Sequence, residues 1–389
     1  SWTVGVFALV ALFLSAPVSA FDFERLSAEA RHFGAVSPLD TSLMPSVRPA
    51  PGAPVVFKPR QEWTVMLYLN GKNNLARAIY ADLAEASKVG SSEKIHIVAE
   101  LGQHGRRNGR WNGARRVYVP HKKTRLPIEL FTSAPIADAR LWSARGFIEN
   151  NPEMLDPDMG HWRHLASFVR WAKHHYPARK YLLVVNGHGA GWKGIAPDDE
   201  TGRHIALREL AKALDQAGPV DVLAFDACLM QTVEVAYELR RHAEVIVGSE
   251  TIEPASGYDY SSVLGSLAEQ PGMDSEAVGR LIVESYRRQY SGSGGLVTSS
   301  ALRASAMEGL RARVDDWVAT LQADGRWDEV WSAASDSLRF RMGSVDLRDL
   351  TLEVDRRLGD APAVLASAQR LREQIETRVI FANAAAAWG

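Results

Sequence analysis

Two residues that could form a catalytic pair, Cys228 and His188, each follow a run of apolar residues. Cys228 is the only cysteine of the chain and comes directly after V-D-V-L-A-F-D-A, residues 220–227. His188 lies in N-G-H-G, which follows Y-L-L-V-V, residues 181–185. Continuous apolar runs of this length are typical of buried strands in a parallel sheet. Active groups collect beyond the carboxyl ends of such strands, so we expect the thiol and the imidazole at one edge.

A thiol and an imidazole at one edge would support attack by a cysteine nucleophile. A free thiol has a pKa of about 8.5 and is only slightly ionised at neutral pH, so it needs a base beside it. His188 could take the thiol proton and later give it to a leaving amine. The N–H groups of Gly189 and Cys228 are candidates for an oxyanion hole. Each residue also has a simpler interpretation, because lone cysteines are often inert core and histidines between glycines are often turn residues.

The elements expected around this pair alternate between strands and helices. Apolar runs predict strands at 63–69, 95–101, 115–119, 181–185, from 220, at 245–247 and at 296–298. Apolar residues at helical spacing predict helices at 75–89, 161–175, 205–217 and 232–241, and a mostly helical chain from about 261. This alternation predicts a doubly wound α/β sheet.

Composition and the N-terminal residues indicate an exported protein. The 389 residues are 46% hydrophobic with a formal net charge of −1, which favours a large core and argues against a general role at nucleic acid or membrane surfaces. The apolar stretch at 4–14 and the small residues up to 20 predict a signal peptide (1–20) whose beginning is missing. Residues 21–60, which are rich in proline, predict a linker or pro-segment. We therefore expect a secreted or periplasmic protein.

The blocks around the two residues resemble those of the clostripain-like cysteine peptidases, in the clan of caspases, legumain and gingipains. The resemblance covers about 63–260 and rests on W-T-V-M-L-Y-L-N with N-N-L, F-V-R-W-A-K-H-H-Y-P-A-R-K-Y, N-G-H-G-A-G-W, F-D-A-C-L-M-Q-T-V-E-V-A-Y-E-L and G-S-E-T-I-E-P-A-S-G-Y-D-Y. It implies a caspase-like three-layer α/β sandwich with a mostly parallel sheet over 61–300, before a mainly helical region at 301–389. It also implies that His188 and Cys228 are the dyad of a secreted endopeptidase working through an acyl-enzyme.

The resemblance further implies cleavage after Arg or Lys, with acidic groups in the primary pocket. Asp226 matches one of these acids, although it could instead support the following loop and helix as an N-cap does. Some relatives have an acid just before the glycine that corresponds to Gly257, where this chain has Ser256. Trp192 could line the cleft or simply pack. The candidate substrate-binding residues are Asp226, Glu253, Ser256, Asp259 and Trp192.

The polar loop at 196–204, between the two catalytic blocks, predicts self-processing. Such loops are preferred sites of nicking, and Arg203 is the basic residue expected to precede the cut. An ordinary uncut surface loop is the alternative.

Two other functions remain open. One is an amide-transfer enzyme using the same dyad, and the other is a catalytically degenerate family member acting as a binding or surface protein. No motif requires a cofactor, and calcium is raised by the family resemblance only. His161 and His164 lack a suitably spaced third ligand, so no metal site is predicted. The expected partners are protein or peptide substrates, with no nucleic acid and no stable membrane insertion.

Overall fold

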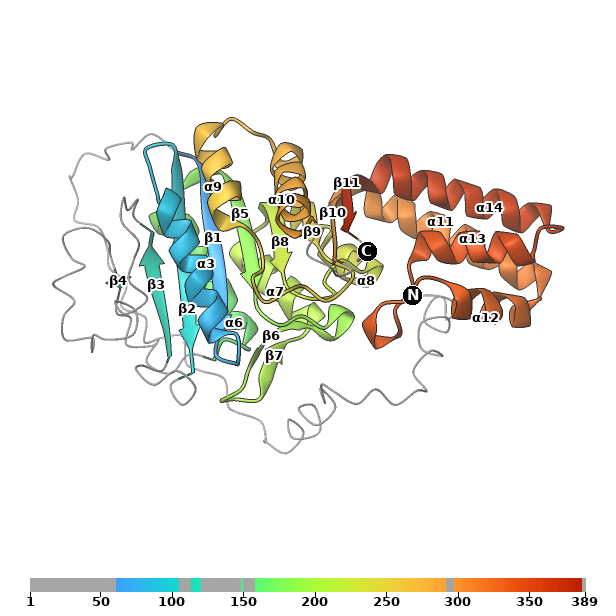
Figure 1. Cartoon of the computed structure of the whole chain (residues 1–389), viewed down its shortest axis with the longest axis horizontal. Coiled ribbons are helices and arrows are strands. Elements are labelled where there is room, and N and C mark those ends of the chain that lie inside the picture. The colour runs from blue at the N-terminus through green and yellow to red at the C-terminus, as the bar shows by residue number, and fades with distance from the viewer. Residues whose placement is uncertain (1–60, 105–112, 120–147, 150–157, 292–296, 387–389) are drawn as a thin grey trace.

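The computed structural model describes residues 61–104, 113–119, 148–149, 158–291 and 297–386 (Figure 1). The predicted signal peptide and linker lie outside the described residues. Among the residues it describes, no helix is both long enough and apolar enough to cross a membrane.

The described chain is built on one nine-stranded sheet of order β11-β10-β9-β8-β5-β1-β2-β3-β4. The five strands from β9 to β2 in this order pair in parallel, and the strands at both ends pair antiparallel. The strands are β1 (Gln61–Gly71), β2 (Ile95–Gln103), β3 (Gly113–Tyr118), β4 (Ile148–Glu149), β5 (Ala178–Asn186), β8 (Val220–Asp226), β9 (Ala243–Gly248), β10 (Val297–Arg303) and β11 (Ile380–Ala386). The mostly parallel sheet is confirmed.

Helices cover both faces of this sheet (Figure 1). One layer comprises α3 (Ala76–Val89), α9 (Tyr260–Glu269) and α10 (Ser275–Tyr290), and the other α6 (Trp162–His175), α7 (Leu207–Ala217) and α8 (Val233–Leu239). Side chains of β1 alternate between the two layers, because Val65 and Leu67 pack with the first and Met66 and Tyr68 with the second. A strand that is buried on both faces needs apolar residues at successive positions, which explains the unbroken apolar runs.

The C-terminal part is mainly helical and lies beside the sheet (Figure 1). Its helices are α11 (Met307–Asp324), α12 (Trp327–Asp336), α13 (Leu347–Arg357) and α14 (Pro362–Glu373). Two features differ from the predictions. The short strand expected at 296–298 extends over Val297–Arg303, and the unpredicted β11 returns the chain to pair antiparallel with β10. Long-range pairing of this kind leaves no local signal in the sequence.

Candidate active site

The ends of β5 and β8 bring the His188 and Cys228 turns together. In the parallel pairing of these strands, Asn186 is opposite Asp226. His188 and Cys228 each follow two residues later, so both leave the sheet at the same edge. Gly187 N donates a hydrogen bond to the Asp226 carbonyl oxygen at 3.2 Å. A Cβ atom on Gly189 would lie only 2.3 Å from the Cys228 carbonyl oxygen, so glycine is required for the two turns to meet this closely.

Cys228 lies half-buried on a strained turn. The next residue, Leu229, has φ of 63°, a value that non-glycine residues rarely adopt and that is concentrated at functional sites. Glu253 N donates a hydrogen bond to Cys228 Sγ at 3.3 Å. Burial raises the pKa of the thiol above its ordinary value, while the Glu253 N–H acts in the opposite direction. The thiol is therefore protonated at neutral pH and must lose its proton to react.

His188 is held by a residue from a different part of the chain. Its Nε2 atom lies 2.6 Å from Oδ1 of Asn74, which belongs to the loop after β1. Because an amide oxygen accepts, Nε2 carries the hydrogen and Nδ1 is the basic atom of the ring. Burial lowers the pKa of His188, with the Asp199 carboxylate acting in the opposite direction, so the ring is neutral and able to take a proton. Asn74 was not among the predicted site residues, because its N-N-L stretch entered only the family resemblance.

The two predicted oxyanion-hole donors belong to the two touching turns. Neither Gly189 N nor Cys228 N donates a hydrogen bond to another residue in the described part of the chain. The neighbouring donors in the same turns are engaged, since Gly187 N and Ala190 N donate to backbone carbonyls. Gly189 N and Cys228 N therefore remain candidates for the donors that a developing oxyanion requires.

Asp226, the last residue of β8, lies in a buried cluster of polar residues. Its Oδ2 atom accepts hydrogen bonds from Asn186 Nδ2 at 2.7 Å, Tyr260 OH at 2.8 Å and Tyr258 N at 3.2 Å. Asn186 Nδ2 also donates to Asp82 at 3.0 Å. Burial raises the pKa of Asp226. The alternative role as a helix cap does not apply, because Thr232 caps α8.

The other predicted substrate-binding residues have separate surroundings. Glu253 is buried, and burial together with the neighbouring Asp226 raises its pKa well above the usual range. Ser256 Oγ pairs with the Tyr290 hydroxyl at 2.9 Å. Asp259 caps α9 by accepting from Ser262 N at 2.9 Å. Trp192, on a 3-10 turn (Gly191–Lys193) just after His188, is 45% exposed. Of these four residues, the structure brings only Glu253 beside Asp226.

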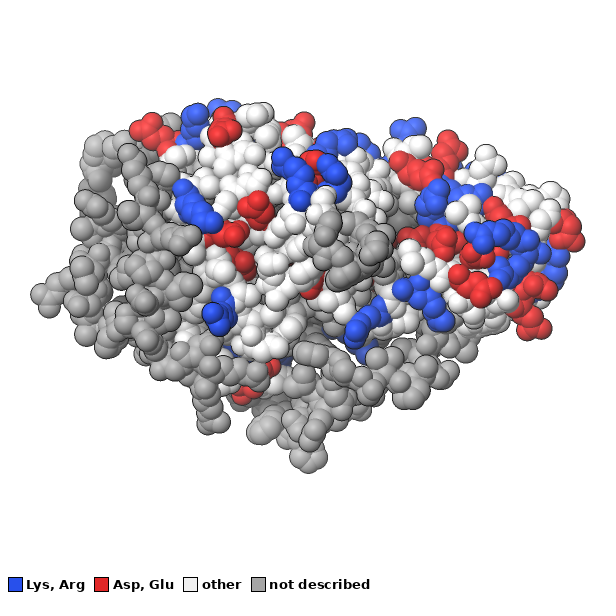
Figure 2. Space-filling view, in the orientation of Figure 1, with Lys and Arg blue, Asp and Glu red and all other residues white. Residues whose placement is uncertain are grey.

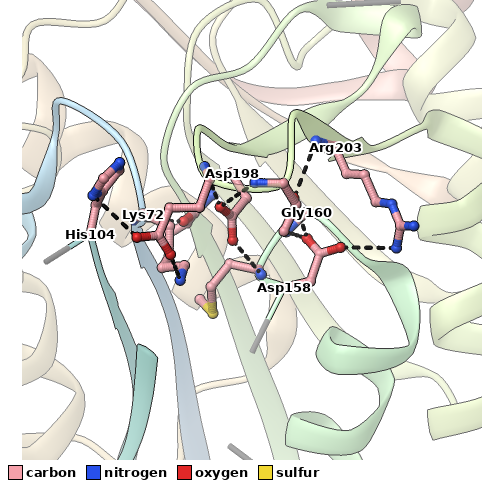
Figure 3. Close-up of polar contacts among 10 residues, drawn as sticks. Lys72, His104, Asp158, Gly160, Asp198 and Arg203 are labelled. Carbon is pink, nitrogen blue, oxygen red and sulfur yellow. Dashed lines mark hydrogen bonds and ion pairs between the residues drawn. The ribbon is translucent and has the colours of Figure 1, made fainter. Parts of the chain in front are cut away.

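The segment expected to be a polar loop at 196–204 is a β-hairpin, formed by β6 (Ile195–Asp198) and β7 (Arg203–Ile205). Figure 3 shows its anchors on both sides. Fully buried Lys72 pairs with Glu200, which also lies 3.3 Å from His104 Nδ1. Arg203, the predicted processing residue, lies in β7 and pairs with Asp158 at 3.2 Å. The polar side chains that suggested a loop are the ones that pair with these distant residues.

The hairpin is also joined to the His188 turn. Ala196 N donates to the His188 carbonyl oxygen at 2.9 Å, and Gly189 forms a β-bridge with Ile195. Asn70 Nδ2 and Asn73 Nδ2 donate to the Pro197 carbonyl at 2.9 Å and 3.0 Å. The asparagines at the end of β1 and in the loop after it therefore position the hairpin, and Asn74 of the same loop positions the imidazole.

The histidines of α6 have structural partners. His161 caps the helix by accepting from Arg163 N at 3.1 Å, and His164 Nε2 lies 2.5 Å from Glu100 Oε1. Over the described ranges, no three His, Cys, Asp or Glu side chains are grouped so that they could hold a metal ion.

The chain is similar in sequence to a known protein. Over 240 residues the chain is 27% identical to clostripain of Hathewaya histolytica, a stretch that makes up 56% of this chain and 44% of that protein. The chain thus spans less than half the length of this relative.

Two solved structures have a similar fold. One is the X-ray structure of a secreted C11 cysteine protease from Bacteroides thetaiotaomicron in complex with an irreversible peptide inhibitor, at 20% identity and a TM-score of 0.62, covering 84% of this chain and 85% of that chain. The other is an inactive zymogen C11 protease from Parabacteroides distasonis, at 18% identity and a TM-score of 0.61, again covering 84% and 85%. The Clostripain family model matches residues 67–352. Because this match includes the His188 and Cys228 turns and most of the chain, the protein belongs to the Clostripain family.

Proposed function

We propose that this protein is a cysteine endopeptidase that hydrolyses peptide bonds through an acyl-enzyme. The observation that carries the proposal is the contact between the His188 and Cys228 turns at the ends of neighbouring parallel strands, with Asn74 holding the imidazole. A neutral thiol beside a neutral imidazole can exchange a proton as the nucleophile attacks.

In the first half of the proposed reaction, Cys228 Sγ attacks the peptide carbonyl carbon and His188 Nδ1 takes the thiol proton. The carbonyl oxygen becomes an oxyanion that accepts from Gly189 N and Cys228 N. The C–N bond then breaks, and His188 gives its proton to the departing amine, which leaves a thioester. In the second half, water attacks the thioester carbon and its proton passes to His188. The C–S bond breaks, and His188 returns the proton to the thiolate sulfur.

We further propose that the residue before the cut bond is Arg or Lys. Asp226 and Glu253 are the carboxyl groups whose charges act directly on Cys228 or its turn. Burial keeps the pKa of both groups raised, and a guanidinium placed beside them would favour their ionised forms. Gly257 has no side chain, so its Cα lies directly against the Asp226 carboxylate. We expect the Arg or Lys side chain of the substrate to pass along this glycine. A planar guanidinium matches a carboxylate better than an ammonium does, so Arg should be preferred.

Export and self-processing are parts of the same proposal. The structural relatives include a secreted protease and a zymogen, and the apolar N-terminal stretch at 4–14 is typical of a signal peptide. The bond after Arg203 is our candidate for the processing cut. Its side chain is ion-paired and its backbone lies in β7, so this cut would require the hairpin to leave its anchors.

The test uses matched peptides that have Arg or its neutral isostere citrulline before the scissile bond. We expect cleavage of the Arg peptide by the wild type, loss of cleavage in Cys228→Ala and His188→Ala, and product masses that show addition of water. Amide transfer would instead give a product carrying the acceptor amine. Asp226→Asn should reduce the preference for Arg over citrulline. Cleavage that persists in Cys228→Ala would overturn the mechanism, and equal rates on both peptides would overturn the specificity.

A further inference from the structure

Three exposed large hydrophobic side chains adjoin the turns of the proposed catalytic pair. In the part of the chain that the structure describes, the side chains of this kind are Trp192, Val233, Ile252, Leu338 and Met342, at 37% to 47% exposure. Trp192 follows the His188 turn, Val233 begins the helix after Cys228, and Ile252 precedes the residue whose N–H donates to the thiol sulfur. Apolar side chains exposed together around a site mark a surface that binds another molecule.

The other two exposed side chains, Leu338 and Met342, belong to a hairpin between α12 and α13. The hairpin is closed by a β-bridge between Arg339 and Val345 and by Phe340 N donating to the Ser344 carbonyl at 2.9 Å. Phe340 is buried and anchors it. Met342 at its tip has φ of 65°, so its exposed position is held against local strain.

This hairpin faces the catalytic edge of the sheet. In Figure 1 it is the orange loop to the left of α12, on the side where β6 and β7 lie. Two electrostatic contacts agree with this placement. Burial raises the pKa of the Cys228 thiol, and the Arg341 guanidinium is near enough to act against that rise. Burial raises the pKa of Glu250 to about 7, and Asp346 at the base of the hairpin adds to this shift.

Arg341 differs from most arginines of the helical region. Blue and red side chains alternate over much of that region in Figure 2, and arginines such as Arg326, Arg348 and Arg357 are ion-paired there. Arg341 is exposed and makes no ion pair or hydrogen bond with another described residue. A guanidinium that pairs with no described carboxylate and lies near enough to the thiol to affect its pKa is suited to a carboxylate that arrives with the substrate.

We propose that the substrate cleft extends onto this hairpin, where Arg341 binds a carboxylate of the peptide close to the scissile bond and Leu338 and Met342 contact apolar side chains beside it. The inference rests on the proposed function, because it assigns a second recognition site to the same peptidase. It predicts peptides with a basic residue before the cut and an acidic group a few residues away. That group is either an acidic side chain or the carboxyl terminus of the peptide.

The experiment compares peptides that share one Arg before the scissile bond. Pairs have Glu or Gln at each of the three positions on either side, and a further pair ends in a free carboxylate or an amide two residues after the bond. At one position or terminus, we expect the wild type to prefer the carboxylate about fivefold in kcat/KM, as exposed ion pairs allow, and the preference to fall with salt. Arg341→Gln should abolish it. Arg370→Gln, which removes an exposed arginine from α14, should keep it.

The ratio within each pair separates binding from reactivity, because both peptides meet the same thiol. A preference that survives Arg341→Gln, or equal rates at every position in the wild type, would overturn the subsite while leaving the peptidase intact. If no peptide is cleaved, the proposed function fails, and alkylation of Cys228 decides the subsite independently. Iodoacetate carries a carboxylate and iodoacetamide does not. Their rate ratio should fall about fivefold in Arg341→Gln and stay constant in Arg370→Gln, whereas an unchanged ratio in Arg341→Gln would refute the subsite.

Discussion

His188 Nε2 lies 2.6 Å from Asn74 Oδ1, and this contact joins the His188 turn after β5 to the loop after β1. The two residues are 114 positions apart in the sequence, and their strands are neighbours in the sheet. In the proposed mechanism Asn74 is a positioning residue, because its amide acts on the imidazole. It fixes the ring orientation and the tautomer in which Nδ1 is basic.

Asn74→Ala should therefore lower kcat by about 10²-fold with little change in KM, because a misplaced base costs rate more than binding. Asn74→Asp should partly restore the rate and place a carboxylate against the ring. The acid limb of the pH–rate profile should then move to higher pH, since a neighbouring negative charge raises the pKa of an imidazole. Steady-state kinetics across pH measure both effects. An unshifted acid limb in Asn74→Asp would assign the asparagine a purely structural role.

Gly189→Ala should separate the two catalytic turns. The added Cβ would lie 2.3 Å from the Cys228 carbonyl oxygen and 2.9 Å from the Met230 side chain, so backbone must move. We expect kcat/KM to fall by about 10²-fold, as for other small displacements of reacting groups. Gly272→Ala is the matched control, because a Cβ there meets nothing within 4 Å. Similar activity of the two variants would contradict the contact.

Asp82→Asn should change how stability depends on pH. Burial, followed by the nearby Asp226, raises the pKa of Asp82 from 3.8 to about 9, so the folded protein holds a proton that the unfolded chain releases. The stability due to this group is complete below pH 3.8 and is lost as pH rises through about 9. Between these values the wild type should lose up to about 1.4 kcal/mol per pH unit more than Asp82→Asn.

Urea unfolding between pH 5 and pH 8 measures this slope. Asp328→Asn, which neutralises an exposed carboxylate at the start of α12, is the control and should keep the wild-type slope. Parallel slopes for wild type and Asp82→Asn would mean that Asp82 is ionised in the folded protein.

Lys72→Met should loosen the β6–β7 hairpin. Lys72 is fully buried and its partner Glu200 is 20% exposed, so removing the cation should cost roughly 3 kcal/mol, at the low end for a buried pair. The double variant Lys72→Met/Glu200→Gln should recover part of this loss, because no unpaired carboxylate remains. Urea unfolding gives the energies, and mass spectrometry follows new termini. If the anchors restrain processing, a terminus at His204 should form faster in Lys72→Met, and an unchanged rate would contradict that restraint.

The sequence by itself determined the sheet and the two turns that hold the proposed catalytic pair. Strands buried on both faces require unbroken apolar runs, so the runs before Asn186 and Asp226 marked strands that end at one edge. The polar and glycine residues that follow could only belong to turns beyond that edge. The positions of Cys228 and His188 at that edge were therefore predictable from local patterns, as was the family resemblance of the blocks that contain them.

The tertiary structure alone decided the partners of those residues. Asn74 reaches His188 because β1 is the neighbour of β5, and the hairpin between α12 and α13 brings Arg341 near enough to Cys228 to affect the pKa of its thiol. The ion pair between Lys72 and Glu200 likewise anchors a hairpin that the sequence had indicated as a loop. Apolar periodicity is a local property that specifies which face of an element is buried. The choice of polar partners depends on strand order and on the paths of distant loops, and these follow only from how the whole chain packs.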